Sequence, residues 1–284
     1  MFMTQPQIQA HRGWSGRYPE NTCLAYQRAL DLPIEGIELD VQLSADGVPV
    51  VIHDATVDRT TDARGRVSQL TAEALARCNA AIRFSSARPS AREIESDDTR
   101  QAEEYGLAFQ PIPTLEQALQ TIWTARPDAV VNIELKVYTG DGHHLVGTVV
   151  PQVWALVDQC GVSRRQVHFS SFRHGCLAHL KRVFPDARIG LLYDRRVTEP
   201  WREALELAAE SINLRHRWIT ADLIQACHAE GVQVAAWTVD DPARIAELFR
   251  AGVDVLISNH PDVAERVRRQ WQKGGDPWAS SSSS

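Results

Sequence analysis

The chain has 284 residues, of which 44% are hydrophobic and 23% charged, and its formal net charge is −6. This composition is typical of a globular protein with a sizeable core, either one large α/β domain or two ordinary ones. The acidic balance and the lack of a basic block argue against nucleic acid or an anionic membrane surface as the main partner. No apolar run approaches a membrane span, and nothing before His11 resembles a signal peptide. Five widely spaced cysteines without a C-x-x-C motif indicate reduced thiols. We therefore expect a cytoplasmic protein without stable membrane insertion.

Strands and helices alternate along most of the chain. A strand at 7–10 ends at His11, and a helix begins near Pro19-Glu20-Asn21-Thr22. Residues 54–110 break the pattern and predict an insertion, with a short helix at 71–77 and a mobile section at 85–98. The serine-rich residues 274–284 predict a disordered tail after a single domain of residues 1–273. From Pro113 onward the pattern predicts helices at 114–122, 145–159, 174–183, 200–209, 220–230, 242–251 and 261–271, and strands at 129–135, 166–170, 188–193, 211–214, 232–237 and 253–257.

Two apolar runs between residues 36 and 54 predict a hairpin. They flank the break Ser44-Ala45-Asp46-Gly47, which is typical of a tight turn. A turn centred on Asp46-Gly47 places Asp40 opposite His53. Glu38 is two residues from Asp40 and lies on the same face of its strand. The hairpin alone therefore predicts two carboxylates and an imidazole close together.

The number of strand–helix units favours a barrel over an open sheet. Strands centred near residues 8, 38, 132, 168, 190, 212, 235 and 255 number eight. The returning arm at 48–53 has too short a connection to be a parallel neighbour, which needs a crossover of a dozen or more residues. We therefore predict an α/β fold, a TIM (β/α)8 barrel with a hairpin after strand two and a small insertion. A doubly wound sheet is the alternative.

Reactive groups of a TIM barrel lie at the carboxyl ends of its strands. Three carboxylates at one rim need a counter-charge, which a hard divalent cation provides. Two cationic side chains at the same rim would suit a phosphate, and two histidines would form an acid/base pair. The predicted residues are Glu38, Asp40 and Glu134 for metal, Arg12 and Lys136 for phosphate, His11 and His53 for proton transfer, and Phe172 and Trp237 for the pocket wall.

Structural explanations exist for each of these residues taken alone. A histidine at a strand end is often structural, and Glu38 with Asp40 could belong to an ion-paired scaffold. Glu134 and Lys136 could simply neutralise each other, and Trp237 and Phe172 could be core residues. Such explanations must account jointly for five acidic or imidazole groups at three converging strand ends, which favours a functional site.

The same residues resemble a known family, the glycerophosphodiester phosphodiesterases, in particular its cytosolic bacterial branch. The resemblance runs from His11 to about Val263. It rests on ordered motifs: His11-Arg12-Gly13, Pro19-Glu20-Asn21-Thr22, Glu38-Leu39-Asp40-Val41, Asp46-Gly47, His53-Asp54, Arg59-Thr60-Thr61, Glu134-Leu135-Lys136 and Trp237-Thr238-Val239.

The resemblance implies one Mg²⁺ or Ca²⁺ on Glu38, Asp40 and Glu134, with His11 and His53 as the acid/base pair and Arg12 and Lys136 on phosphate oxygens. We expect a small-molecule glycerophosphodiester substrate, cleaved to sn-glycerol 3-phosphate and an alcohol. The attacking oxygen is either the substrate's own glycerol hydroxyl, through a cyclic phosphate, or water. Self-association is left open by the sequence.

Two rival functions remain at this point. A zinc amidohydrolase barrel would need His-x-His on the first strand, whereas Arg12 and Gly13 follow His11. A catalytically silent barrel that binds phosphodiesters, as a sensor or partner module, would keep the fold without turnover.

Overall fold

The strands follow the apolar, β-branched runs of the sequence, since such residues pack well on a pleated surface. A computed structural model of the chain describes residues 5–84 and 109–273. Within them, nine strands run in the order β1-β9-β8-β7-β6-β5-β4-β2-β3, and β1 also pairs with β2. Eight parallel strands thereby close a barrel: β1 (Gln7–His11), β2 (Gly36–Leu43), β4 (Val130–Leu135), β5 (Val167–Ser171), β6 (Arg188–Tyr193), β7 (Ser211–Arg215), β8 (Gln233–Trp237) and β9 (Val255–Ser258). The predicted TIM barrel is confirmed, and the doubly wound alternative is wrong.

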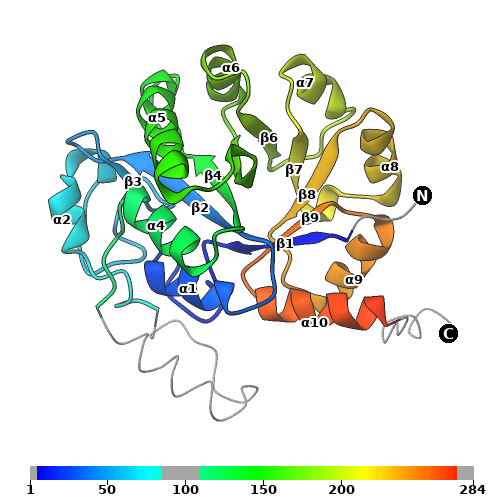
Figure 1. Cartoon of the computed structure of the whole chain (residues 1–284), viewed down its shortest axis with the longest axis horizontal. Helices are drawn as coiled ribbons and strands as arrows, with labels where there is room; N and C mark the ends of the chain where they lie inside the picture. Colours follow the sequence, from blue (N-terminus) through cyan, green and yellow to red (C-terminus); the bar gives the residue numbers. More distant parts are fainter. Residues whose placement is uncertain (1–4, 85–108, 274–284) are drawn as a thin grey trace, which may run out of the picture.

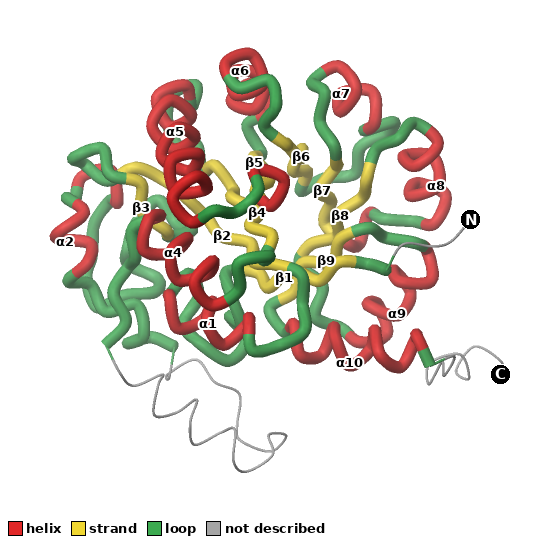
Figure 2. Tube along the Cα trace, viewed as in Figure 1, coloured by secondary structure: helices red, strands yellow, loops and turns green. Residues whose placement is uncertain are grey.

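Helices surround the barrel on the outside (Figures 1 and 2). Local sequence signals fix their ends. Thr114 and Gln117 form a capping box at the start of one helix, and Asp241 caps the helix that begins with Pro242. The helix predicted at 200–209 is shorter, because Ala208 has a left-handed backbone (φ 50°). The helices are α1 (Cys23–Leu30), α4 (Leu115–Ala125), α5 (His143–Cys160), α6 (His174–Val183), α7 (Trp201–Glu206), α8 (Ala221–Ala229), α9 (Pro242–Ala251) and α10 (Pro261–Gln272). No helix of the described ranges is both long and apolar enough to cross a bilayer.

The hairpin after β2 forms, but its predicted register is wrong by one residue. Strand β3 (Pro49–Val51) is antiparallel to β2, with Val41 opposite Val51. Three residues, not two, separate the closing pair Ser44 and Val48, and Gly47 supplies the left-handed conformation (φ 79°) that such a turn needs. The residue that bonds to the Asp40 carbonyl oxygen is therefore Ile52 (N–O 3.0 Å), not His53.

His53 nevertheless reaches the rim, because the chain leaves the sheet after Val51. Gln42 Nε2 donates to the carbonyl oxygens of Ile52 and Asp54 (both 2.8 Å) and fixes this bend. The Tyr138 hydroxyl donates to the carbonyl oxygen of His53. These hydrogen bonds, which no pairing rule predicts, position the histidine.

The described part of the predicted insertion packs on β3 with a small core of its own. Val50 and Ile52 of the hairpin contact Val57, Val67 and Leu75 there. The core includes the 3₁₀ turn η1 (Val67–Gln69) and the predicted short helix, α2 (Ala72–Ala76). In Figure 1 this unit lies at the edge of the barrel beside β3. The sections predicted to be mobile (85–98) and disordered (274–284) fall outside the described residues.

Arg268 of α10 connects the last helix to the residues that precede β1 and β2. Its side chain is 3% exposed and donates to Glu265 (2.7 Å) and to both carboxylate oxygens of Glu35 (2.8 and 2.7 Å). It also reaches the carbonyl oxygens of Pro33 and Pro6 (2.6 and 3.2 Å).

We expect Arg268→Ala to lower the free energy of unfolding by about 3 kcal/mol, since it leaves Glu265 Oε2 and backbone carbonyls without a donor, while Glu265 Oε1 keeps Arg269. Urea denaturation measures this loss. The matched control is Arg269→Ala, whose side chain is 59% exposed and pairs with the same Glu265. It should change stability by less than about 1 kcal/mol. Equal effects of the two substitutions would contradict this account of Arg268.

Candidate active site

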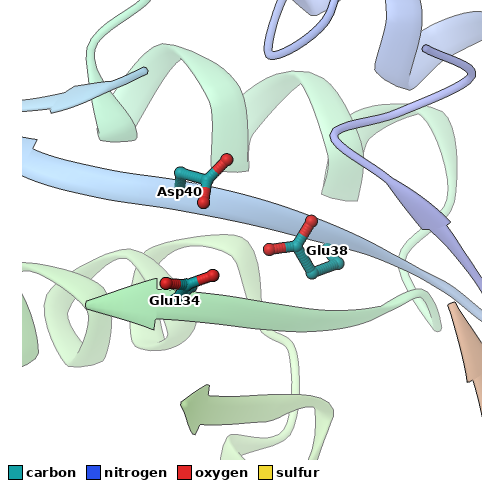
Figure 3. Close-up of side chains that lie close together, drawn as sticks. All are labelled: Glu38, Asp40 and Glu134. Atoms are coloured by element: carbon teal, nitrogen blue, oxygen red, sulfur yellow. The ribbon is translucent and has the colours of Figure 1, made fainter. Parts of the chain in front are cut away.

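Three carboxylates from adjacent strands converge inside the barrel mouth. Glu38 and Asp40 lie on β2, and Asp40 is the register partner of Glu134 on β4. One oxygen of each lies within 4.8 Å of the others, and all three residues are buried. Figure 3 shows the three side chains gathered where the two strands adjoin. The alternation of each strand places Glu38 and Asp40 inward while Ile37, Leu39 and Val41 pack outward.

Close packing of these carboxylates changes their proton affinities. Burial and the charge of Asp40 raise the pKa of Glu134 to about 7. Burial, Asp40 and Glu134 raise the pKa of Glu38 well above its ordinary value. Burial acts in the same direction on Asp40, but Arg12 and Lys136 outweigh it and hold the pKa of Asp40 below its ordinary value. Such a cluster of like charges binds either protons or a cation near neutral pH.

Arg12 joins this cluster from the end of β1. Its backbone is left-handed (φ 58°), so the chain turns sharply after His11. The Arg12 backbone N–H lies 3.1 Å from Glu38 Oε2, and its Nε lies 3.1 Å from Asp40 Oδ2. Arg12 Nη1 donates to Glu20 Oε1 (2.8 Å). The guanidinium is thus held by two carboxylates at the cavity wall.

Lys136 lies behind the carboxylates. Its Nζ is 2.7 Å from Glu134 Oε1 and 3.5 Å from Asp40 Oδ1, and its side chain is 8% exposed. The pairing of Glu134 with Lys136, one of the structural explanations, is therefore present. It leaves Glu38 without a lysine partner and does not account for the convergence of all three acids.

The histidines His11 and His53 line the same cavity. His53 Nδ1 lies 2.6 Å from Asp54 Oδ1, and since an ionised carboxylate only accepts, Nδ1 carries the proton. Burial, Arg12 and Lys136 lower the pKa of His53. Burial and Arg12 lower the pKa of His11 to about 4, so His11 is neutral at pH 7.

A cavity of about 370 Å³ opens between these groups and an aromatic wall. Phe172 and Trp237 meet edge to face, with ring centroids 5.5 Å apart. Arg215 lies over Trp237, with Cζ 5.2 Å from the ring centroid. The cavity is lined from all eight parallel strands and by His53, through residues that include His11, Arg12, Glu38, Glu134, Phe172, Asp194, Arg215, Trp237 and Ile257. Asp40 and Lys136 are not among its lining residues; Asp40 is fully buried, and Lys136 Nζ lies 5.9 Å from the centroid of the Phe172 ring.

Several supporting residues have no predicted role in the sequence. Asn21 donates from Nδ2 to Asp40 Oδ2 (2.9 Å) and accepts from the Tyr26 hydroxyl (3.0 Å). Arg59 of the insertion bonds both Glu20 (2.7 Å) and Asp54 (2.6 Å), and so connects the partners of Arg12 and His53. In the sequence, Glu20, Asn21 and Arg59 stand out only as members of the ordered family motifs. Their roles could not be predicted, because their contacts depend on the tertiary fold.

Comparison with known proteins decides the family. The model of the glycerophosphoryl diester phosphodiesterase family matches residues 11–263. The chain belongs to this family. It is accordingly an enzyme of the phosphoric diester hydrolase class.

Relatives match over nearly the whole length of this family member. It is 36% identical to a glycerophosphodiester phosphodiesterase of Caldanaerobacter subterraneus over 266 residues, covering 94% of this chain and 98% of the relative. Among solved structures, an Oleispira antarctica phosphodiesterase in complex with the product sn-glycerol-3-phosphate superposes with a TM-score of 0.75 at 26% identity, covering 93% and 96% of the two chains. A glycerophosphodiester phosphodiesterase of Agrobacterium tumefaciens gives 0.69 at 27% identity, covering 92% and 99%.

Proposed function

We propose that the protein is a metal-dependent phosphodiesterase that cleaves glycerophosphodiesters to sn-glycerol 3-phosphate and an alcohol. The observation that carries this proposal is the convergence of three buried carboxylates, two histidines and Arg12 around one cavity. The Oleispira relative, which is bound to sn-glycerol-3-phosphate, supports the substrate class. We also infer that residues 1–273 act as a single catalytic domain.

The carboxylate cluster fits a divalent cation. Asp40 Oδ1 is buried and has no hydrogen-bond partner, which leaves an oxygen free for a ligand bond. Glu38, Asp40 and Glu134 would hold Mg²⁺ or Ca²⁺, since both prefer carboxylate oxygens. When bound, the cation supplies positive charge to the non-bridging phosphate oxygens.

Proton transfer is assigned to the two histidines. His11, neutral at pH 7, takes the proton of the attacking oxygen, which belongs to either the glycerol hydroxyl or water. His53 gives a proton from Nε2 to the departing alcohol oxygen while Nδ1 stays bonded to Asp54. For this step His53 must be doubly protonated, and the anionic phosphodiester beside it favours that form.

Binding of the substrate is assigned to the remaining wall residues. Arg12 and Lys136 provide fixed positive charge for the phosphate, and Arg12 faces the cavity directly. Phe172 and Trp237 form the apolar wall against which the carbon skeleton packs. Lys136 does not line the cavity and also offsets the charges of Glu134 and Asp40.

The test is release of sn-glycerol 3-phosphate from glycerophosphocholine, with and without EDTA. We expect release that EDTA abolishes and that Mg²⁺ or Ca²⁺ restores. No release from any of several head groups would favour a silent phosphodiester-binding barrel. Rescue by zinc alone would contradict the assignment of Mg²⁺ or Ca²⁺ to the carboxylate cluster.

Metal affinity should depend on pH in a defined direction. Because the pKa values of Glu38 and Glu134 are raised, these carboxyls keep their protons to higher pH than ordinary carboxyls when no cation is bound. A cation must displace these protons, so its affinity rises with pH, by up to about tenfold per pH unit for each proton displaced. Calorimetric titration of Mg²⁺ at pH 6 and pH 8, in two buffers of different ionisation enthalpy, measures both the affinity and the released protons. A dissociation constant that does not change with pH would contradict the assigned cluster.

A further inference from the structure

A chain of hydrogen bonds runs behind His11, away from the cavity. His11 Nδ1 lies 2.7 Å from Asn259 Oδ1, just beyond the end of β9. Asn259 Nδ2 donates to Asp240 Oδ2 (2.7 Å), in the loop after β8. The other Asp240 oxygen accepts from the Asn259 backbone N–H (2.8 Å) and from the Ser258 hydroxyl (3.0 Å). The function proposed above uses neither Asn259 nor Asp240.

Asp240 determines which atom donates and which accepts in each of these hydrogen bonds. An ionised carboxylate has no proton to donate, so the Asn259 atom that faces Asp240 must be the amide nitrogen. The amide oxygen then faces His11 Nδ1 at 2.7 Å and also lies 2.9 Å from the Ser15 hydroxyl. At 2.7 Å a ring nitrogen without a proton would set its lone pair against that oxygen. His11 Nδ1 must therefore carry the proton, and Nε2 must carry the lone pair. In the opposite arrangement two oxygens would face each other across 2.7 Å.

We propose that Asp240, acting through Asn259, fixes the tautomer of His11 with the proton on Nδ1, so that the Nε2 lone pair is available at the cavity. The His11 ring then presents its basic nitrogen on the side where Nε2 lies 3.9 Å from Glu38 Oε2. Asp240 and Asn259 are positioning residues, and the catalytic consequence rests on the proposed role of His11 as the base.

There is also an electrostatic reason why the residue next to His11 is an asparagine and not a carboxylate. His53 is oriented directly by a carboxylate, Asp54, whose charge Arg59 offsets. His11 instead lies beside Glu38, within a cluster of three carboxylates. A neutral amide orients the ring there and keeps the charge of Asp240 one residue further away.

The decisive variant is Asp240→Asn. Its amide can bond the Asn259 N–H and the Ser258 hydroxyl through oxygen, and its nitrogen then faces Asn259. Asn259 must rotate to accept, which turns its own nitrogen toward His11 and requires Nδ1 to accept. We expect the proton to move to Nε2, and kcat to fall about 10²-fold with KM nearly unchanged, as loss of a general base does.

The exchange variant Asp240→Asn with Asn259→Asp tests the direction of the chain. The amide introduced at position 240 would donate to the carboxylate introduced at position 259, which accepts from His11 Nδ1–H as the native amide does. We expect this double variant to return the proton to Nδ1 of His11. Its kcat should be at least about tenfold higher than that of Asp240→Asn. The matched control is Asp241→Asn, because Asp241 caps α9 through the Arg244 N–H (2.8 Å) and asparagine caps equally well.

The readout is the ¹⁵N spectrum of ¹⁵N-histidine-labelled full-length protein with Mg²⁺ at pH 7, with His11 assigned by its loss in His11→Gln. Wild type, Asp241→Asn and the exchange variant should show protonated Nδ1, and Asp240→Asn protonated Nε2. An unchanged tautomer in Asp240→Asn would overturn the proposal, whether or not turnover falls. Protonated Nε2 in wild type would also overturn it. The spectrum reports on the proposal even if no glycerophosphodiester is hydrolysed, in which case only the proposed function fails.

Discussion

His53→Ala is expected to lower kcat for glycerophosphodiester hydrolysis about 10³-fold, because the departing alcohol then leaves without a proton donor. Mg²⁺ affinity should stay within a few-fold of wild type, since His53 is not one of the three converging ligands. Steady-state kinetics on glycerophosphocholine and Mg²⁺ titration of the same preparations measure the two quantities.

A matched control for this substitution is His228→Ala. His228 pairs with Asp254 (2.7 Å), which precedes β9 at the opposite end of the barrel, and its side chain is 40% exposed. It should keep wild-type kcat. Substrates with a better leaving group, such as nitrophenyl esters, should suffer less from His53→Ala, because they need less protonation. An equal loss on good and poor leaving groups would remove His53 from the acid role.

Glu134→Gln should weaken Mg²⁺ binding by about 100-fold or more, because it removes one of three anionic ligands while keeping the shape of the side chain. Activity at limiting metal should fall accordingly and recover in part at high Mg²⁺. Metal titrations followed by turnover measure the shift.

The stability of the metal-free Glu134→Gln variant supplies an independent check. The pKa of Glu134 in the folded protein is about 7, above the ordinary carboxyl value, so its ionised form opposes folding at higher pH. At pH 8 without metal, Glu134→Gln should therefore have a free energy of unfolding equal to or greater than that of the wild type. Glu73→Gln, an exposed carboxylate of α2, is the control and should change neither property. A clear loss of metal-free stability in Glu134→Gln would instead indicate a structural role for the Glu134–Lys136 pair.

The barrel could be predicted from the sequence because its signals are local and repeat. Strands such as Val130–Leu135 are apolar runs rich in β-branched residues and interrupted only by Asn132 and Glu134, and helices such as α9 carry their own caps. The inward direction of Glu38, Asp40 and Glu134 follows from the period of two along a strand, and parallel pairing brings them to one rim.

The parts that could not be predicted depend on tertiary contacts. The register of the hairpin depends on whether its loop has two or three residues. A register shift of one residue moves every side chain of a strand to the opposite face of the sheet. His53 reaches the site through a bend held by Gln42, not through strand pairing. The contacts of Arg59 with Glu20 and of Asn259 with His11 join residues that are 39 and 248 positions apart, which no spacing rule detects.

The most direct test of the central claim is a metal titration of stripped protein, followed by both metal content and release of sn-glycerol 3-phosphate from glycerophosphocholine. The account predicts no turnover in the stripped protein, turnover that rises in proportion to bound Mg²⁺ or Ca²⁺ until one cation per chain is bound, and no such rise in Glu134→Gln over the same range. Full turnover in protein without detectable metal, or turnover in Glu134→Gln with unaltered metal dependence, would contradict it.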